Sequence, residues 1–158
     1  MTAKEYLKQY RSIAAEIVQR RIIVKRMKSE IFGGPTDRVT AGMEAVGGKT
    51  MAMATWNTED LAAYQKQIEE QEQTISEFRK YMANVVRQIS SLESSDFRII
   101  LFGKYIVLLT WEEISASLNL AEEYTRKEMH QAALQAFTEK FFYEFYKVPP
   151  KSPKNPAS

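Results

Sequence analysis

Apolar residues recur at alternating steps of about four and three in two long segments of this chain, and this spacing constrains the fold more than any other feature. In the first segment the apolar residues are Tyr6, Tyr10, Ile13, Ile17, Val24, Met27 and Ile31. In the second segment they are Leu61, Tyr64, Ile68, Ile75, Phe78, Met82, Val85, Ile89 and Leu92. Arg20 interrupts the first series and Gln71 interrupts the second. Such spacing places side chains along one face of an α-helix, so the sequence predicts two long helices, each with an apolar seam.

The ends of the two helices are also marked in the sequence. Gly33, Gly34 and Pro35 should end the first helix, because glycine relaxes the helical backbone and proline lacks an N–H donor. Asn57 or Thr58 can cap the second helix, and the acidic residues that follow suit a helix N-terminus.

Residues 1–95 are therefore expected to form a long antiparallel, coiled-coil-like hairpin in which each seam covers the other. A homodimer in which the seams pair between two chains is the alternative. Residues 1–32 carry eight basic and three acidic side chains, whereas the second helix is mainly acidic. This charge difference suits both pairings and does not choose between them.

The connection between the helices, residues 33–57, is rich in glycine and far longer than most connections. We expect a mobile loop there. Met43, Met51, Met53 and Trp56 can serve either as an adaptable contact for a partner or as apolar residues that fold back on the hairpin.

Residues 96–147 have the pattern of several short helices, and we expect a helix-turn-helix. Asp96 can cap a first helix and Thr110 a second one, which runs to Leu118. Asn119 suits the left-handed turn that follows. The expected small core consists of Ile114, Leu118 and Leu120, with Ser115 at the close contact of the two helices.

The third helix of this module begins near Ala121 or Glu122 and has an ambiguous register, because Thr125 or Arg126 can take the inward position. Steps of four, three and four favour a buried stripe of Thr125, Met129, Ala132 and Ala136. On that register the residues that face outward are Glu122, Glu123, Arg126, Lys127, His130 and Gln131.

The window from Thr110 to Leu120 resembles region 4 of sigma factors. The runs 97–101, 110–114 and 130–134, together with Tyr105, resemble an uncharacterised family of phage and mobile-element proteins of Gram-positive bacteria. That family is related to the ArpU-type phage transcriptional regulators. The resemblance implies a role in transcription regulation, with promoter DNA and RNA polymerase as partners.

The residues predicted to contact DNA are Arg126, Lys127, Gln131, His130 and Thr110. Arginine and lysine neutralise phosphates, and arginine and glutamine can read base edges. A secondary basic face on the first helix, which can bind nucleic acid directly, consists of Arg20, Arg21, Lys25, Arg26 and Lys28. In the rival interpretation the module binds no DNA and acts as an adaptor or inhibitor of a host protein. The excess of eight acidic over six basic residues in 96–147 favours that alternative.

The last part of the chain is unusually aromatic. Phe137, Phe141 and Phe145 share a helical face and are expected in the core, whereas Phe142 and Tyr146, if exposed, would mark a protein interface. Residues 148–158 contain four prolines and are expected to form a flexible tail.

Several functions find no support in the sequence. With no cysteine and one histidine, we expect no disulfide, no metal site and no cofactor. No group of residues has the spacing of a catalytic or phosphate-binding motif, so we expect neither an enzyme nor a small-molecule substrate. No run of apolar residues is long enough for a membrane span or a signal peptide, so a soluble cytoplasmic protein of a bacterial host is expected.

Overall fold

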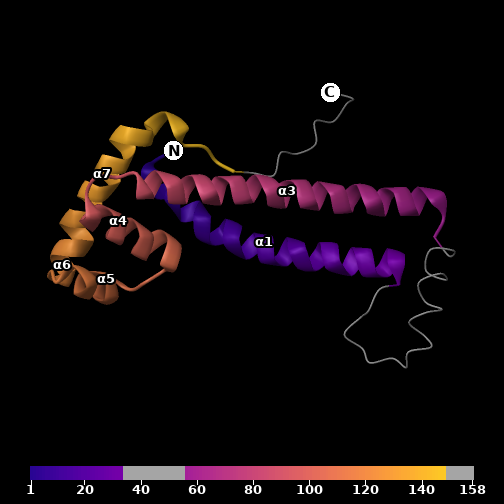
Figure 1. The fold of residues 1–158 in the computed structure, drawn as a ribbon, viewed down its shortest axis with the longest axis horizontal. Helices are drawn as coiled ribbons and strands as arrows, with labels where there is room; N and C mark the ends of the chain where they lie inside the picture. The colour runs from indigo at the N-terminus through magenta and orange to yellow at the C-terminus, as the bar shows by residue number, and fades with distance from the viewer. Residues whose placement is uncertain (34–55, 149–158) are drawn as a thin grey trace. The chain divides into compact units, whose positions relative to one another are not determined.

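The computed structural model describes residues 1–33 and 56–148, and within them the protein is all-α with no strand, as predicted (Figure 1). Its two long helices are α1 (Ala3–Phe32) and α3 (Thr58–Ser90). The chain divides into two compact units, one made of Met1–Ala15 with Phe78–Ser158 and the other of Glu16–Glu77. Both long helices therefore contribute to both units. The boundary expected between residues 95 and 96 lies inside the first unit, and each unit is described separately below.

The unit of residues 16–77 is an antiparallel pair formed by the second half of α1 and the first half of α3. Its buried seam consists of Ile17, Val24, Ile31, Ile68 and Ile75. The two polar residues that interrupt the predicted seams contact each other, since Arg20 Nη1 donates a hydrogen bond of 2.6 Å to Gln71 Oε1. The predicted hairpin within one chain is thus confirmed, and its polar seam positions are matched across the pair.

The predicted ends of this pair are confirmed as well. Asn57 Oδ1 accepts a 2.7 Å hydrogen bond from the Asp60 backbone N–H, directly before α3. Gly33 has a φ of 60°, a left-handed conformation that glycine adopts at low cost. Trp56 packs on Tyr64 with ring centroids 4.6 Å apart, so this one residue of the connection folds back on the hairpin. The predictions for Met43, Met51 and Met53 lie outside the described residues.

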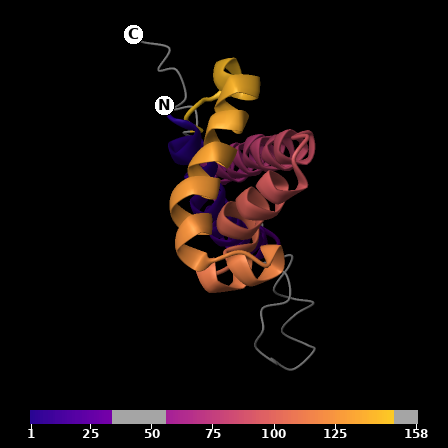
Figure 2. The ribbon, with the colours of Figure 1, turned by 90° about the vertical axis from the view of Figure 1, so that its left-hand side faces the viewer.

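The other unit combines the two ends of the long helices with the short helical segments. These segments are α4 (Ser95–Leu101), η1 (Phe102–Val107), α5 (Trp111–Leu118), α6 (Glu122–Tyr124), η2 (Thr125–Met129), α7 (His130–Phe141) and η3 (Phe142–Glu144). α7 lies beside α4, and α5 lies across one end of this pair (Figure 2). The fully buried core includes Tyr6, Leu7, Phe78, Tyr81, Val85, Ile89, Ile100, Leu101, Ile114 and Phe137.

The cap of α4 differs from the prediction. Ser94, not Asp96, is the N-cap, and its hydroxyl accepts a hydrogen bond from the Phe97 backbone N–H. Because α4 begins at Ser95, Asp96 lies in the first turn. There its negative charge interacts favourably with the positive end of the helix dipole.

The segment that follows α7 is hydrogen-bonded to α1. Gln9 holds this segment with both ends of its amide: its Nε2 donates to the Tyr146 carbonyl at 3.0 Å, and its Oε1 accepts from the Val148 N–H at 2.9 Å. The remainder of the predicted tail, residues 149–158, lies outside the described residues. Within the described residues, no helix is both long and apolar enough to cross a membrane.

Candidate nucleic-acid interface

The first helix of the predicted motif, α5, is fixed at both ends. Thr110 Oγ1 accepts from the Glu113 N–H, and the Glu113 carboxylate accepts from the Thr110 N–H, which is a capping box. At the other end Asn119 has φ 56° and ψ 42°, in the left-handed region. Both predictions are confirmed. The turn at Asn119 therefore sets the direction in which the chain enters the next helix.

The small core around α5 is only partly as predicted. Ile114 and Ser115 are buried, and Leu118 is half-buried. Leu120 was expected in this core, but 37% of its surface is exposed. The space beside Ile114 is filled by η1 instead, because a Cβ on Gly103 would lie only 2.9 Å from Ile114 Cγ1.

The second helix of the predicted motif consists of α6, η2 and α7, and it is called the recognition helix below after its predicted role. Its register is set by a π-helical turn, η2. The His130 backbone N–H donates to the Thr125 carbonyl, five residues back, where an α-helix would use residue 126. This wider turn accommodates one extra residue. The predicted buried stripe is therefore correct at Thr125 and wrong after it, since Met129, Ala132 and Ala136 are only half-buried. The side chains that are buried instead are His130, Ala133, Leu134, Phe137 and Phe141.

The outward position predicted for His130 is consequently wrong. His130 is buried, its Nε2 is hydrogen-bonded to Tyr105 Oη at 2.8 Å, and its ring lies 4.9 Å from the Trp111 ring. Burial, together with the positive charges of Lys4, Lys104 and Lys8, lowers the pKa of His130 to about 4. His130 is therefore a neutral core residue and not a DNA contact.

The exposed face of the recognition helix carries the other predicted contacts. Arg126, Lys127 and Gln131 are all exposed. Lys127 Nζ lies 2.8 Å from a Glu123 carboxylate oxygen, one turn away. Thr110 is also exposed, and while its oxygen caps α5, its hydroxyl proton can still be donated. The structure thus brings four of the five predicted DNA contacts to the surface of one module.

The secondary basic face belongs to the other unit and is only partly free. Arg20 is half-buried and pairs with Glu16 at 3.0 Å, and Lys28 Nζ lies 2.6 Å from Glu72 Oε1. Placing Arg20 on an open basic face was therefore wrong, because its position in the seam turns it toward α3. The cations of this face that remain exposed and make no ion pair with a described residue are Arg21, Lys25 and Arg26.

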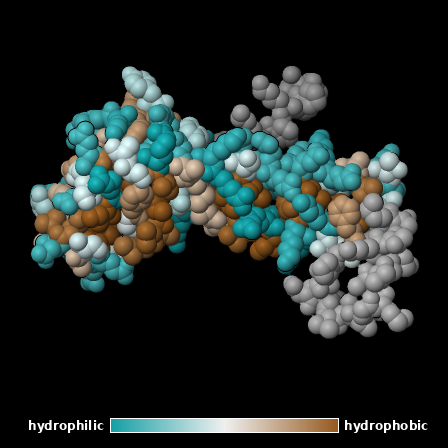
Figure 3. All heavy atoms as spheres, viewed as in Figure 1, coloured by the Kyte–Doolittle hydropathy of each residue, from teal (hydrophilic) through white to brown (hydrophobic). Residues whose placement is uncertain are grey.

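The aromatic end divides only partly as predicted, because α7 ends at Phe141 and Phe145 lies in extended backbone beyond the helix, where it is half-buried. Phe137 and Phe141 are buried, and Phe145 stacks on Tyr6 with ring centroids 5.0 Å apart. Phe142 is 57% exposed and Tyr143 is 96% exposed, and Tyr146 is also exposed. Apolar side chains reach the surface over α4 and η1 too, where Ile99, Val107 and Leu108 are exposed (Figure 3).

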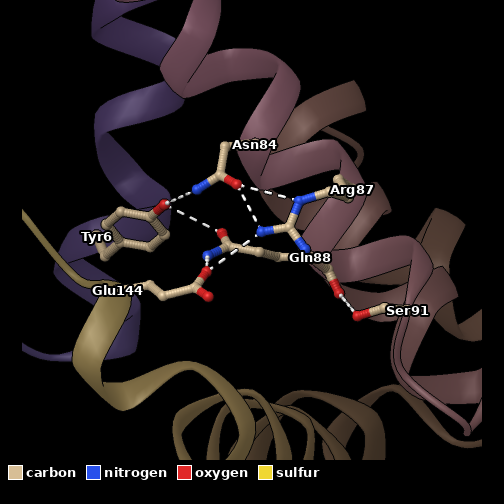
Figure 4. Close-up of polar contacts among 6 residues, drawn as sticks. All are labelled: Tyr6, Asn84, Arg87, Gln88, Ser91 and Glu144. Carbon is tan, nitrogen blue, oxygen red and sulfur yellow. Dashed lines mark hydrogen bonds and ion pairs between the residues drawn. The ribbon is translucent and has the colours of Figure 1, made fainter.

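A polar network that the sequence reasoning missed lies beneath this aromatic end (Figure 4). Tyr6 Oη donates to Oε1 of the buried Gln88 at 3.0 Å, and Gln88 Nε2 donates to Glu144 at 2.6 Å. Burial raises the pKa of Tyr6 to about 12, so its proton stays available for this bond. The one sign of this network in the sequence was Gln88, a polar residue between the apolar residues Val85 and Ile89. An open pocket of about 360 Å³ adjoins the network, lined by Asn84, Arg87, Tyr143, Glu144, Phe145 and Tyr146.

Comparisons with known proteins add no family to this geometry. A scan against protein-family models, a search of curated proteins and a search of solved structures each gave no match. No group of three or more acidic or histidine side chains among the described residues could hold a metal ion. The argument for a nucleic-acid interface therefore depends on the geometry of the motif alone. That geometry consists of a capped helix, a left-handed turn and a helix with two exposed cations.

Proposed function

We propose that this protein is a transcription regulator of a phage or mobile element, whose sigma-region-4-like helix-turn-helix contacts promoter DNA, RNA polymerase or both. The observation that supports DNA contact is the exposure of Arg126, Lys127 and Gln131 on a helix that directly follows the turn at Asn119. In a helix-turn-helix, the early residues of the second helix face the bases and the first helix crosses the phosphate backbone.

Each exposed residue has a chemical role on this proposal. Arg126 and Gln131 can read base edges in the major groove, and Thr110 can donate to a phosphate at the start of α5. Lys127 is paired with Glu123, but an exposed pair of this kind contributes about 0–1 kcal/mol, so a phosphate can displace the carboxylate.

The direct test is selection of bound sequences from a pool of randomised duplexes. The full chain should enrich a defined sequence, and the double variant Arg126→Ala, Gln131→Ala should lose that enrichment while keeping its helical content. Lys66→Ala, an exposed lysine on α3, is the matched control and should enrich the same sequence. The absence of any enrichment with the unaltered chain would refute DNA reading.

A second candidate function is a protein-interaction module, an adaptor or inhibitor that binds no DNA. It is favoured by the exposed rings of Phe142 and Tyr143 beside an open pocket, since exposed aromatic side chains are enriched at protein interfaces. Here the variant Phe142→Ala, Tyr143→Ala should abolish capture of one host protein, and RNA polymerase is the first to examine. Capture that is unchanged in this variant would refute the assignment of this surface.

A further inference from the structure

The first turns of α1 carry a row of positive charges that the DNA-binding proposal does not use. Lys4, Lys8 and Arg11 follow one another at steps of four and three, so they share one face of the helix. All three are exposed, and none makes an ion pair with a described residue. Residues on a different side of the same turns, Ala3 and Leu7, are buried.

This part of α1 is held against the recognition helix. Tyr6 is fully buried, and its ring lies 6.2 Å from Phe137 of α7 and stacks on Phe145. Tyr81 Oη also donates to the Tyr6 carbonyl at 2.5 Å. These contacts fix the turns that carry Lys4 and Lys8 within the same compact unit as the helix-turn-helix.

A third lysine approaches the same place from η1. Lys104 Nζ lies 4.9 Å from the centre of the Trp111 ring, at the N-terminus of α5, and the same ring packs on His130. Lys4, Lys8 and Lys104 all act electrostatically on His130, lowering its pKa in addition to the effect of burial. Lys104 therefore lies at the N-terminus of α5, against the ring that packs on His130, and Lys4 and Lys8 are near enough to the same histidine to act on its charge.

We propose that Lys4, Lys8 and Lys104 form a phosphate-binding cluster that contacts the DNA backbone beside the bases read by the helix-turn-helix. This inference rests on the function proposed above. It supplies cations that the start of the recognition helix lacks, since its first turns offer only Arg126 and Lys127 and carry Glu122 and Glu123. Phosphate contacts strengthen binding and fix the position of the protein on the duplex without reading sequence.

The test is the salt dependence of DNA affinity for the full chain and for Lys4→Gln, Lys8→Gln. Each phosphate contact contributes about −0.9 to the slope of log affinity against log salt. The double variant should therefore flatten the slope by about 2 and weaken binding on the order of tenfold per lysine near 0.1 M salt, with the preferred sequence unchanged. Lys104→Gln should flatten it by about half as much. The control, Lys66→Gln, Arg79→Gln, removes two exposed charges from α3 and should leave the slope unchanged.

The outcomes separate this inference from the function on which it rests. If the unaltered chain binds a defined sequence and the Lys4, Lys8 variant has the same slope, the cluster is refuted and the regulator proposal stands. If the control variant flattens the slope equally, the cluster is also refuted, because the effect is then not local. If the unaltered chain binds no DNA, the cluster and the proposed DNA contact of the helix-turn-helix both fail, and only contact with RNA polymerase is left of the regulator proposal.

The single histidine provides a second measurement. Removing the charges of Lys4 and Lys8 should raise the pKa of His130, as followed by NMR of its ring protons. An unchanged His130 pKa in the double variant would place the two lysines away from this end of α7 and overturn the cluster.

Discussion

The buried His130 predicts a specific loss of stability in mild acid. Its pKa is lowered from 6.5 to about 4 by burial and by the charges of Lys4, Lys104 and Lys8. Between these two values the unfolded chain binds a proton that the folded chain excludes. The free energy of unfolding should therefore be constant above pH 6.5 with respect to this group and should fall as the pH drops toward 4.

The size of this effect follows from the two pKa values. At about 1.36 kcal/mol per pKa unit, the His130 contribution between pH 7 and pH 5 is about 2 kcal/mol of lost stability. His130→Gln is the informative variant, because its amide can accept the Tyr105 hydrogen bond and does not titrate.

The assay is urea unfolding of both proteins at pH 7 and pH 5, followed by circular dichroism. Between pH 7 and pH 5 the free energy of unfolding should fall by about 2 kcal/mol more in the unaltered chain than in His130→Gln. This holds whatever the difference in stability between the two proteins at pH 7. Carboxylate titration is common to both proteins and cancels in this comparison. If the two proteins lose stability in parallel, the argument that the core excludes charge at His130 is refuted.

Four further substitutions, at three positions, test the packing of the helix-turn-helix unit by the midpoint of chemical denaturation. Gly103→Ala should lower the free energy of unfolding by about 1–2 kcal/mol. Overpacking against Ile114 costs about 1–3 kcal/mol, and the better helix propensity of alanine offsets up to about 1 kcal/mol of that cost. A more stable variant would contradict the close contact. Asn119→Gly should be nearly neutral, whereas Asn119→Ala should cost about 1 kcal/mol at this left-handed position, and equal effects would argue against the turn. Gln88→Leu should cost about 1–3 kcal/mol, because it leaves the buried Tyr6 hydroxyl without its main acceptor, and no loss would show that the network is dispensable.

Much of the fold could be predicted from the sequence because it depends on local periodicity. The two seams follow from helix geometry, and even their polar interruptions, Arg20 and Gln71, are explained by one hydrogen bond across the pair. Thr110 and Asn119 were recognisable because capping and left-handed turns depend on a single side chain and its neighbours.

The recognition helix shows where local reasoning fails. A regular α-helix after Thr125 would have turned the His130 side chain outward. No residue type in the segment predicts the π-helical turn that buries this side chain. The sequence left two registers open, with Thr125 or Arg126 inward, and which side chains are buried after this point depends on the packing partners Tyr105 and Trp111. Contacts between distant segments, such as the bond between Tyr6 and Gln88, were likewise beyond sequence patterns.

The central claim, that the helix-turn-helix reads DNA, is tested most directly in the host cell. The tagged chain and its Arg126→Ala, Lys127→Ala variant would be crosslinked and recovered, and the bound DNA sequenced. Discrete peaks that are present with the unaltered chain and lost in the variant are the predicted result. No peaks with either protein, together with one dominant co-purified protein, would contradict the claim and identify the module as a protein-binding one.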